Sequence, residues 1–208
     1  MQIQYHHYDL PHDHNLKGSL AIDTEAMGLN NLRDRLCLIQ IKDEDGKIFL
    51  IHYPKANFNS PNLKQVLLDS SRKKIFHYAR FDVAILQYSF QIEMQNIYCT
   101  KIASRLSRTY TNQHGLKDLC LQLLDVKLSK QQRCSDWGNE SLNEEQMRYA
   151  ANDVEYLHEL SNILTELLKR ENRLYIAQKC FDFLPHRAQL DVIGWNNIDI
   201  FSYSTVEG

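Results

Sequence analysis

The chain has 208 residues, of which 43% are hydrophobic and 24% are charged. A chain of this kind can bury the core of one domain, and its composition excludes a low-complexity or fibrous protein. Its 24 Lys and Arg residues nearly balance its 26 Asp and Glu residues, so any contact with nucleic acid must be local rather than spread over a basic molecule.

The first third of the chain predicts an antiparallel β-meander. Three short runs that are apolar or rich in β-formers are separated by polar, turn-like loops, and they comprise residues 19–23, 36–41 and 47–53. We expect a helix to follow, because Ser60 is a typical N-cap residue and Pro61 suits the first helical position.

Strand and helix signals then alternate along the chain. Residues 73–78 predict a strand, residues 79–90 a helix, and residues 96–106 a short strand that runs into a helix. An antiparallel meander followed by alternating strands and helices indicates an α/β fold.

The last part of the chain is expected to be helical. Residues 115–126 are amphipathic, and residues 143–184 predict a long helical stretch, either continuous or broken, that Pro185 ends. Because no Pro/Gly/Ser-rich linker interrupts the chain, we expect one domain over residues 1–208 with a short C-terminal extension at about 185–208.

Neither the cysteines nor the histidines predict a zinc site. The cysteines are odd in number, widely spaced and without a C-x-x-C pair, so we expect them to be reduced and mostly buried: Cys37, Cys99, Cys120, Cys134 and Cys180. Residues 1–14 are polar and histidine-rich, and a metal site there is the less favoured alternative. No apolar run reaches the roughly 20 residues that span a bilayer, and the chain starts without a signal-peptide hydrophobic segment, so we expect a cytoplasmic protein without membrane contact.

Acidic residues occur in a pattern that needs an explanation. Asp23 and Glu25 are two positions apart in a predicted strand, so they share a face and repel each other unless a cation lies between them. Asp82 opens a predicted helix, and Tyr149 and Asp153 share one face of a later helix. Each motif alone has a plain structural reading: a solvated turn, a helix-dipole partner or a surface pair.

Together and in this order, the three motifs resemble the DEDD superfamily of 3′-5′ exonucleases, in the tyrosine-bearing branch that includes ribonuclease D. The resemblance covers about residues 16–180, and Tyr149, four residues before Asp153, disfavours the branch that carries histidine there. It implies a ribonuclease H-like mixed sheet, with three antiparallel strands and then parallel strands, flanked by helices. The compact length and the stretches IDTEAMGLNNLRDRLCLIQ and LDVIGWNNIDIFS are more similar to the stand-alone nano-ribonuclease C type than to ribonuclease D proper, which carries further RNA-binding domains.

The resemblance implies a metal cage of four carboxylates, whose hard oxygen ligands suit Mg²⁺ or Mn²⁺. Two ions roughly 3.5–4 Å apart would stabilise the attacking and leaving oxygens of a displacement at phosphorus. In this interpretation Asp23 bridges both ions, Glu25 and Asp153 hold the ion that generates hydroxide, and Asp82 supports the other. Tyr149, whose ordinary pKa near 10 makes it a poor base, orients the attacking water. The expected product is a nucleoside 5′-monophosphate released from a 3′ end.

Candidate substrate contacts lie close to these acids. Met27 and Leu29 are apolar and could wedge against the terminal bases, or else belong to the core. His77 could reach the scissile phosphate region, or else be structural. Arg33 and Arg35 offer phosphate contacts, although two arginines in a loop are commonly a solvated surface.

Very short RNA is the expected substrate, and the 3′ tails of structured RNA and DNA remain open alternatives. A catalytically inactive, nucleic-acid-binding member of the same fold is the second class of function, disfavoured because all four acids and the tyrosine are present. The apolar, aromatic residues 190–204 must be buried against the chain itself or a neighbour, and the resemblance implies a ring-like homo-oligomer, an octamer.

Overall fold

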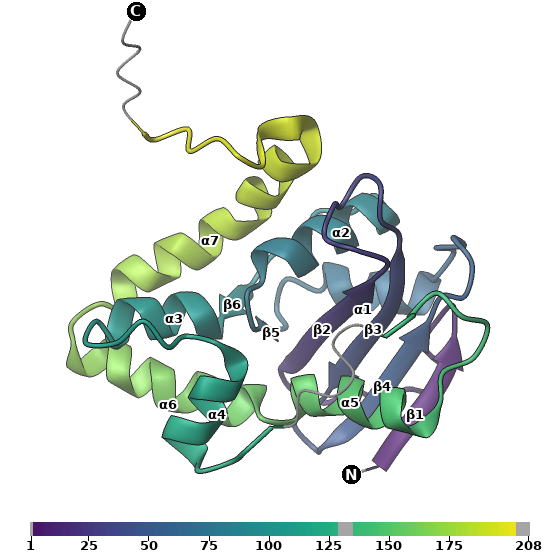
Figure 1. The fold of residues 1–208 in the computed structure, drawn as a ribbon, viewed down its shortest axis with the longest axis horizontal. Coiled ribbons are helices and arrows are strands. Elements are labelled where there is room, and N and C mark those ends of the chain that lie inside the picture. The colour runs from purple at the N-terminus through teal and green to yellow at the C-terminus, as the bar shows by residue number, and fades with distance from the viewer. Residues whose placement is uncertain (1, 129–134, 203–208) are drawn as a thin grey trace, which may run out of the picture.

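The computed structural model describes residues 2–128 and 135–202. A mixed sheet of six strands, in the order β1-β4-β3-β2-β5-β6, forms the centre of the described part (Figure 1). The strands are Gln2–His7 (β1), Leu20–Ala26 (β2), Leu36–Lys42 (β3), Lys47–His52 (β4), Lys74–Phe76 (β5) and Ile97–Cys99 (β6). β2, β3 and β4 pair antiparallel, whereas β2, β5 and β6 pair parallel, which confirms the predicted fold class.

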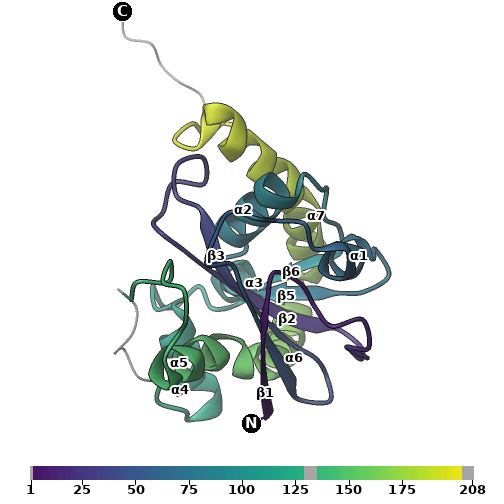
Figure 2. The ribbon, with the colours of Figure 1, turned by 90° about the vertical axis from the view of Figure 1, so that its right-hand side faces the viewer.

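Helices cover both faces of this sheet. They are Pro61–Leu68 (α1), Arg80–Phe90 (α2), Thr100–Ser107 (α3), Leu116–Leu124 (α4), Glu144–Glu155 (α5), Leu157–Arg170 (α6) and Leu174–Leu190 (α7), followed by the π-helical turn Asp191–Trp195 (η1). α5 lies in front of the sheet in Figure 1, while α1 and α2 lie behind it, and Figure 2 shows the sheet between them. Because β3 is covered on both faces, its residues 36–41 are all buried, and all of them except Gln40 are apolar.

β1 was not predicted, because its sequence QIQYHH looks like a polar terminus. It is a half-buried edge strand that pairs parallel with β4 over residues 2–7. The Tyr5 hydroxyl lies 2.6 Å from Nδ1 of His52, the last residue of β4. Backbone pairing with β4 and this cross-strand hydrogen bond therefore stabilise β1, although its sequence has no alternating apolar pattern.

The start of α1 differs from its prediction in one respect. Ser60 is the residue before the helix, but its hydroxyl donates to the carbonyl of Tyr8 instead of capping the helix. The carboxylate of Asp9 takes over that role, since its oxygens accept hydrogen bonds from the backbone N–H groups of Asn62 at 3.1 Å and Leu63 at 2.8 Å. The cap therefore comes from a distant part of the chain, which a local motif does not reveal.

The prediction that Pro185 ends the last helix is wrong, because α7 continues through it to Leu190. The buried side chains of α7 stand three or four positions apart on both sides of the proline, at Ala177, Phe181, Leu184 and Ala188. Packing of this stripe outweighs the hydrogen bond that a proline removes. The carbonyl of Pro185 also accepts a hydrogen bond of 3.1 Å from Nε2 of Gln87 in α2.

A cluster of charges ties the end of the described chain to the start of α2. Asp191 accepts two hydrogen bonds of 2.7 Å from the guanidinium of Arg80 and one of 2.6 Å from Arg187. Arg80 also donates to the carbonyl of Asn196 at 2.6 Å. Part of the predicted C-terminal extension is therefore fastened to the helix that carries Asp82, while residues 203–208 lie outside the described residues.

Candidate active site

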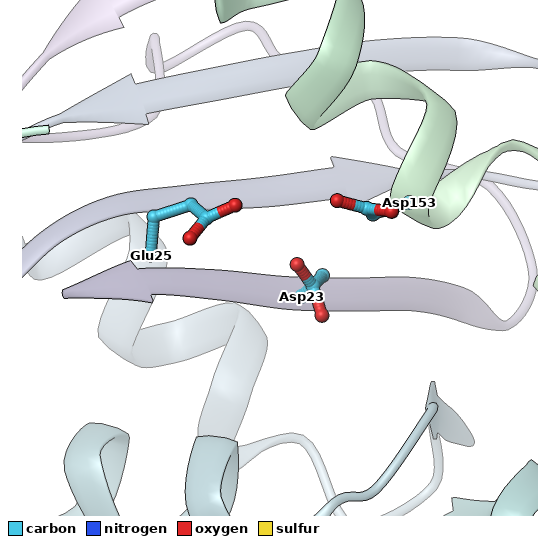
Figure 3. Close-up of side chains that lie close together, drawn as sticks. All are labelled: Asp23, Glu25 and Asp153. Carbon is cyan, nitrogen blue, oxygen red and sulfur yellow. The ribbon is translucent and has the colours of Figure 1, made fainter. Parts of the chain in front are cut away.

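Three carboxylates from two elements converge on the front face of the sheet. Asp23 and Glu25 alternate with Thr24 along β2, so both project toward α5, which contributes Asp153 (Figure 3). Each residue offers one oxygen, and these oxygens lie within 4.8 Å of one another. Within residues 2–128 and 135–202 this is the one such group of three or more potential ligands, so the N-terminal histidines form none.

Asp82 approaches the same place from α2. It is buried, and its Oδ1 accepts a hydrogen bond of 2.6 Å from the Thr24 hydroxyl. Thr24 is the β2 residue between Asp23 and Glu25, so this bond ties α2 to the acidic end of the strand. Asp82 is not part of the compact group of three, but it is close enough to Asp23 for its charge to act on that carboxyl.

Burial and neighbouring negative charges raise the pKa values of two of these acids, Asp23 and Asp82. Burial raises the pKa of Asp23 well above its ordinary value, and the charges of Asp82, Asp153 and Glu25 raise it further. Burial likewise raises the pKa of Asp82 to about 7, against the hydrogen bond from Thr24, which favours the charged form. Such a site calls for compensating positive charge, and its all-oxygen donor set fits a hard divalent cation.

Tyr149 lies four residues before Asp153 on α5, and the start of this helix is firmly fixed. Asn143 and Gln146 form a reciprocal capping box, with hydrogen bonds of 2.8 and 3.0 Å. The ring of Trp137, in the segment before the helix, lies 6.2 Å from the Tyr149 ring. Trp137 is not predicted from the sequence, because its contact with Tyr149 joins separate parts of the chain.

Arg35 does not present its charge to a ligand. Its guanidinium donates hydrogen bonds to four backbone carbonyls, those of Leu36 at 3.4 Å, Tyr53 at 2.5 Å, Pro54 at 2.8 Å and Gly138 at 3.1 Å. The predicted phosphate contact is therefore replaced by a structural role, in which Arg35 fastens the segment beside Trp137 to the end of β4. Arg33 is exposed and pairs with its neighbour Asp34 at 2.7 Å.

Met27 and Leu29 follow β2 and face solvent, with 61% and 88% of their surfaces exposed, so the core alternative is wrong for both. The side chain of Met27 lies next to Gly138. A Cβ atom placed on Gly138 would lie 3.5 Å from the Cε atom of Met27. His77 is held by a contact of 2.9 Å between its Nδ1 and the Thr100 hydroxyl. Burial, aided by Lys101, lowers the pKa of His77 to about 3, so the ring is neutral at pH 7.

Other expectations from the sequence concern the cysteines and membranes. Cys37, Cys99 and Cys120 are buried and free, and Cys180 is free and partly exposed, whereas Cys134 lies outside the described residues. In the part of the chain that the structure describes, none of the helices has the length and apolar character that crossing a bilayer requires.

The fold and the acidic cluster define a class, and comparison with known proteins places the chain in a family. Residues 8–169 match the 3′-5′ exonuclease family, so the chain belongs to it. This agrees with the resemblance drawn from the acidic motifs.

Individual relatives refine this result. The structure of Brucella melitensis NrnC bound to pGG is 48% identical, with a TM-score of 0.94 over 98% of this chain and 100% of that one. A structure of the same protein with bound Mg²⁺ has a TM-score of 0.93. Ribonuclease D of Gluconacetobacter diazotrophicus is 31% identical over 155 residues, and this chain covers only 39% of its length.

The raised pKa of Asp82 predicts a pH dependence of the metal-free protein. An unfolded aspartate has a pKa near 3.9, so the folded protein binds the extra proton between about pH 4 and 7, and this contribution to stability is lost as the pH rises through that window. In EDTA at pH 8, Asp82→Asn should therefore be more stable than wild type, by up to about 4 kcal/mol at about 1.4 kcal/mol per pKa unit. Near pH 4 the two proteins should be equally stable.

Urea unfolding of both proteins at several pH values measures this difference. The comparison with the variant is needed because the lowered pKa of His77 acts in the opposite direction on the stability of both proteins. A stability difference that does not change between pH 4 and 8 would contradict the prediction.

Proposed function

We propose that the chain is an exoribonuclease that removes nucleoside 5′-monophosphates from the 3′ end of RNA with the help of divalent cations. The observation that carries the proposal is the convergence of Asp23, Glu25 and Asp153, with Asp82 beside them at a raised pKa. Membership of the 3′-5′ exonuclease family gives this cluster its reaction class. The buried free cysteines are in keeping with a cytoplasmic enzyme.

The proposed roles follow the positions of the side chains. Asp23, Glu25 and Asp153 would hold Mg²⁺ or Mn²⁺ together with Asp82, and two bound ions would neutralise the acids and stabilise charge on the phosphodiester oxygens. Tyr149, on the same helix as Asp153, would orient the attacking water through its hydroxyl. Support for a cation comes from the all-oxygen donors and from the Mg²⁺-bound structure of the similar NrnC.

We further propose very short RNA as the preferred substrate. The support is the likeness to NrnC, which was solved with pGG, and the exposure of Met27 and Leu29, which are free to contact terminal bases. The candidate phosphate contact of His77 would use its Nε2, because Nδ1 faces Thr100. The 3′ tails of structured RNA and DNA are the alternative substrates.

A homo-oligomer completes the proposal. Large apolar side chains of the C-terminal segment are exposed in the single chain: Ile193, Trp195, Ile198, Ile200 and Phe201. Large apolar side chains that are exposed along one short segment are in keeping with an interface. The resemblance to the nano-ribonuclease C type implies an octamer, in which enclosed sites would favour small substrates.

The first test of the function is release of mononucleotide from a 3′-labelled RNA. Wild-type protein should release it with Mg²⁺ or Mn²⁺ and not with EDTA, and Asp23→Asn should be inactive, because the substitution removes a central metal-binding charge. The fold should remain intact in this variant, as judged by circular dichroism. Bound RNA without any product in the presence of metal would instead favour the inactive, nucleic-acid-binding alternative.

The second test separates orientation of water from metal binding. Tyr149→Phe removes one hydroxyl and leaves every carboxylate in place, so turnover should fall by about 100-fold, as expected for loss of a group that positions a nucleophile. The affinity for Mn²⁺, measured by calorimetry, should stay within about twofold of wild type. Parallel losses of turnover and metal affinity would assign Tyr149 a structural role instead.

The third test addresses substrate length and assembly. We expect light scattering at micromolar concentration to report an oligomer, and the rate on a dinucleotide to exceed the rate on a long unstructured RNA. A monomer would remove the assembly proposal. Equal rates on both RNAs would remove the length preference while leaving the exonuclease assignment in place, and faster hydrolysis of a matched DNA would favour the DNA alternative.

A further inference from the structure

Gln40, in the centre of β3, is a buried polar residue that the function proposed above does not use. Its side chain is fully buried, and neither the amide oxygen nor the amide nitrogen has a hydrogen-bond partner among the described residues. An amide left unpaired in the interior destabilises a protein, whereas an apolar side chain of similar size would not. A glutamine at this position therefore needs an explanation other than packing.

The sheet register places Gln40 next to the candidate metal site. Gln40 is directly opposite Asp23 in the antiparallel pairing of β2 with β3. Residues opposite each other in such a pair project to the same face, with Cβ atoms roughly 4.5–5.5 Å apart. The side chain of Gln40 therefore stands beside that of Asp23, on the face where Glu25 and Asp153 also gather.

The contacts of Lys42 locate Gln40 relative to α5. Lys42 is two residues after Gln40 on the same face, and its Nζ donates to the backbone carbonyl of Glu155 at 2.5 Å and to its carboxylate at 3.1 Å. Glu155 is in turn two residues after Asp153 on α5, and Figure 3 shows Asp153 over β3. Gln40 thus lies under α5, between the strand that carries Asp23 and the helix that carries Asp153.

We propose that Gln40 is a positioning residue of the metal site, whose amide N–H group supports the carboxylate of Asp23 when a divalent cation is bound. The inference rests on the proposed function, because it assigns Gln40 to the cation-loaded state. A neutral donor suits this place, since it stabilises an ionised carboxylate without competing with the cation as a second positive charge. Partners of this kind orient metal-binding side chains, and their loss typically weakens metal binding by about 10- to 100-fold.

The test compares Gln40→Met with a matched control, Gln87→Met. Gln87 is also a buried glutamine, but both ends of its amide are bonded, to the Pro185 carbonyl and to the backbone N–H of Met94. In EDTA, Gln87→Met should lower the melting temperature by about 2–4 °C or more through its lost hydrogen bonds. Gln40→Met should leave it unchanged or raise it, because no bond is lost in the metal-free protein.

The two variants should change places when metal binding is measured, with Gln40→Met now the more affected. By calorimetry with Mn²⁺ alone, Gln40→Met should bind about 10- to 100-fold more weakly than wild type, while Gln87→Met should bind as wild type does. Gln40→Leu serves as a second apolar variant and should behave as Gln40→Met does. Because the readout is metal affinity rather than turnover, it does not depend on the identity of the substrate.

Three results would overturn the inference. Mn²⁺ affinity equal to wild type in both Gln40 variants removes the positioning role, and melting temperatures in EDTA that fall as far as that of Gln87→Met assign Gln40 a structural role instead. Wild-type protein that binds no Mn²⁺ overturns the proposed metal site along with the inference. If wild-type protein binds Mn²⁺ and the Gln40 variants bind it equally well, the inference is overturned but the proposed metal site is not.

Discussion

Repulsion among closely spaced carboxylates is the constraint on which the rest of this structure depends. Asp23 has the charges of Asp82, Asp153 and Glu25 around it, and burial withdraws the water that would screen them. Left to itself, such a group would take up protons or move apart. Holding the acids close together requires elements whose positions are rigidly fixed. The strand and helices that carry the acids meet this requirement.

Each element that carries an acid is fixed at more than one point. α5 is capped at its start by Asn143 with Gln146 and is held at its end by Lys42. α2 is tied to β2 through the bond between Thr24 and Asp82, and its first residue, Arg80, is tied to Asp191 of η1. The candidate site is thus preorganised by bonds that lie mostly outside it, which is how metal sites reach a defined geometry.

The sequence predicted those features that local patterns determine. Apolar runs revealed the meander, and the spacing of Asp23 with Glu25 predicted a shared face, which the structure has. β1, the path of α7 through Pro185 and the role of Arg35 were not predictable in this way, because each depends on contacts with residues far away in the chain. Trp137 belongs to the same group, since no motif connects an indole to a tyrosine twelve residues later.

The charge cluster of Arg80, Asp191 and Arg187 determines where the chain can be shortened for laboratory work. A fragment that stops at Pro185 looks natural from the sequence, yet it would lack Arg187 and Asp191. Asp191 is the carboxylate that pairs with Arg80, and Arg80 lies two residues before Asp82 on α2. The carbonyls of Asn196 and Ile198 also accept hydrogen bonds from these arginines. A minimal expression fragment should therefore extend past Ile198, and a fusion partner belongs beyond that point.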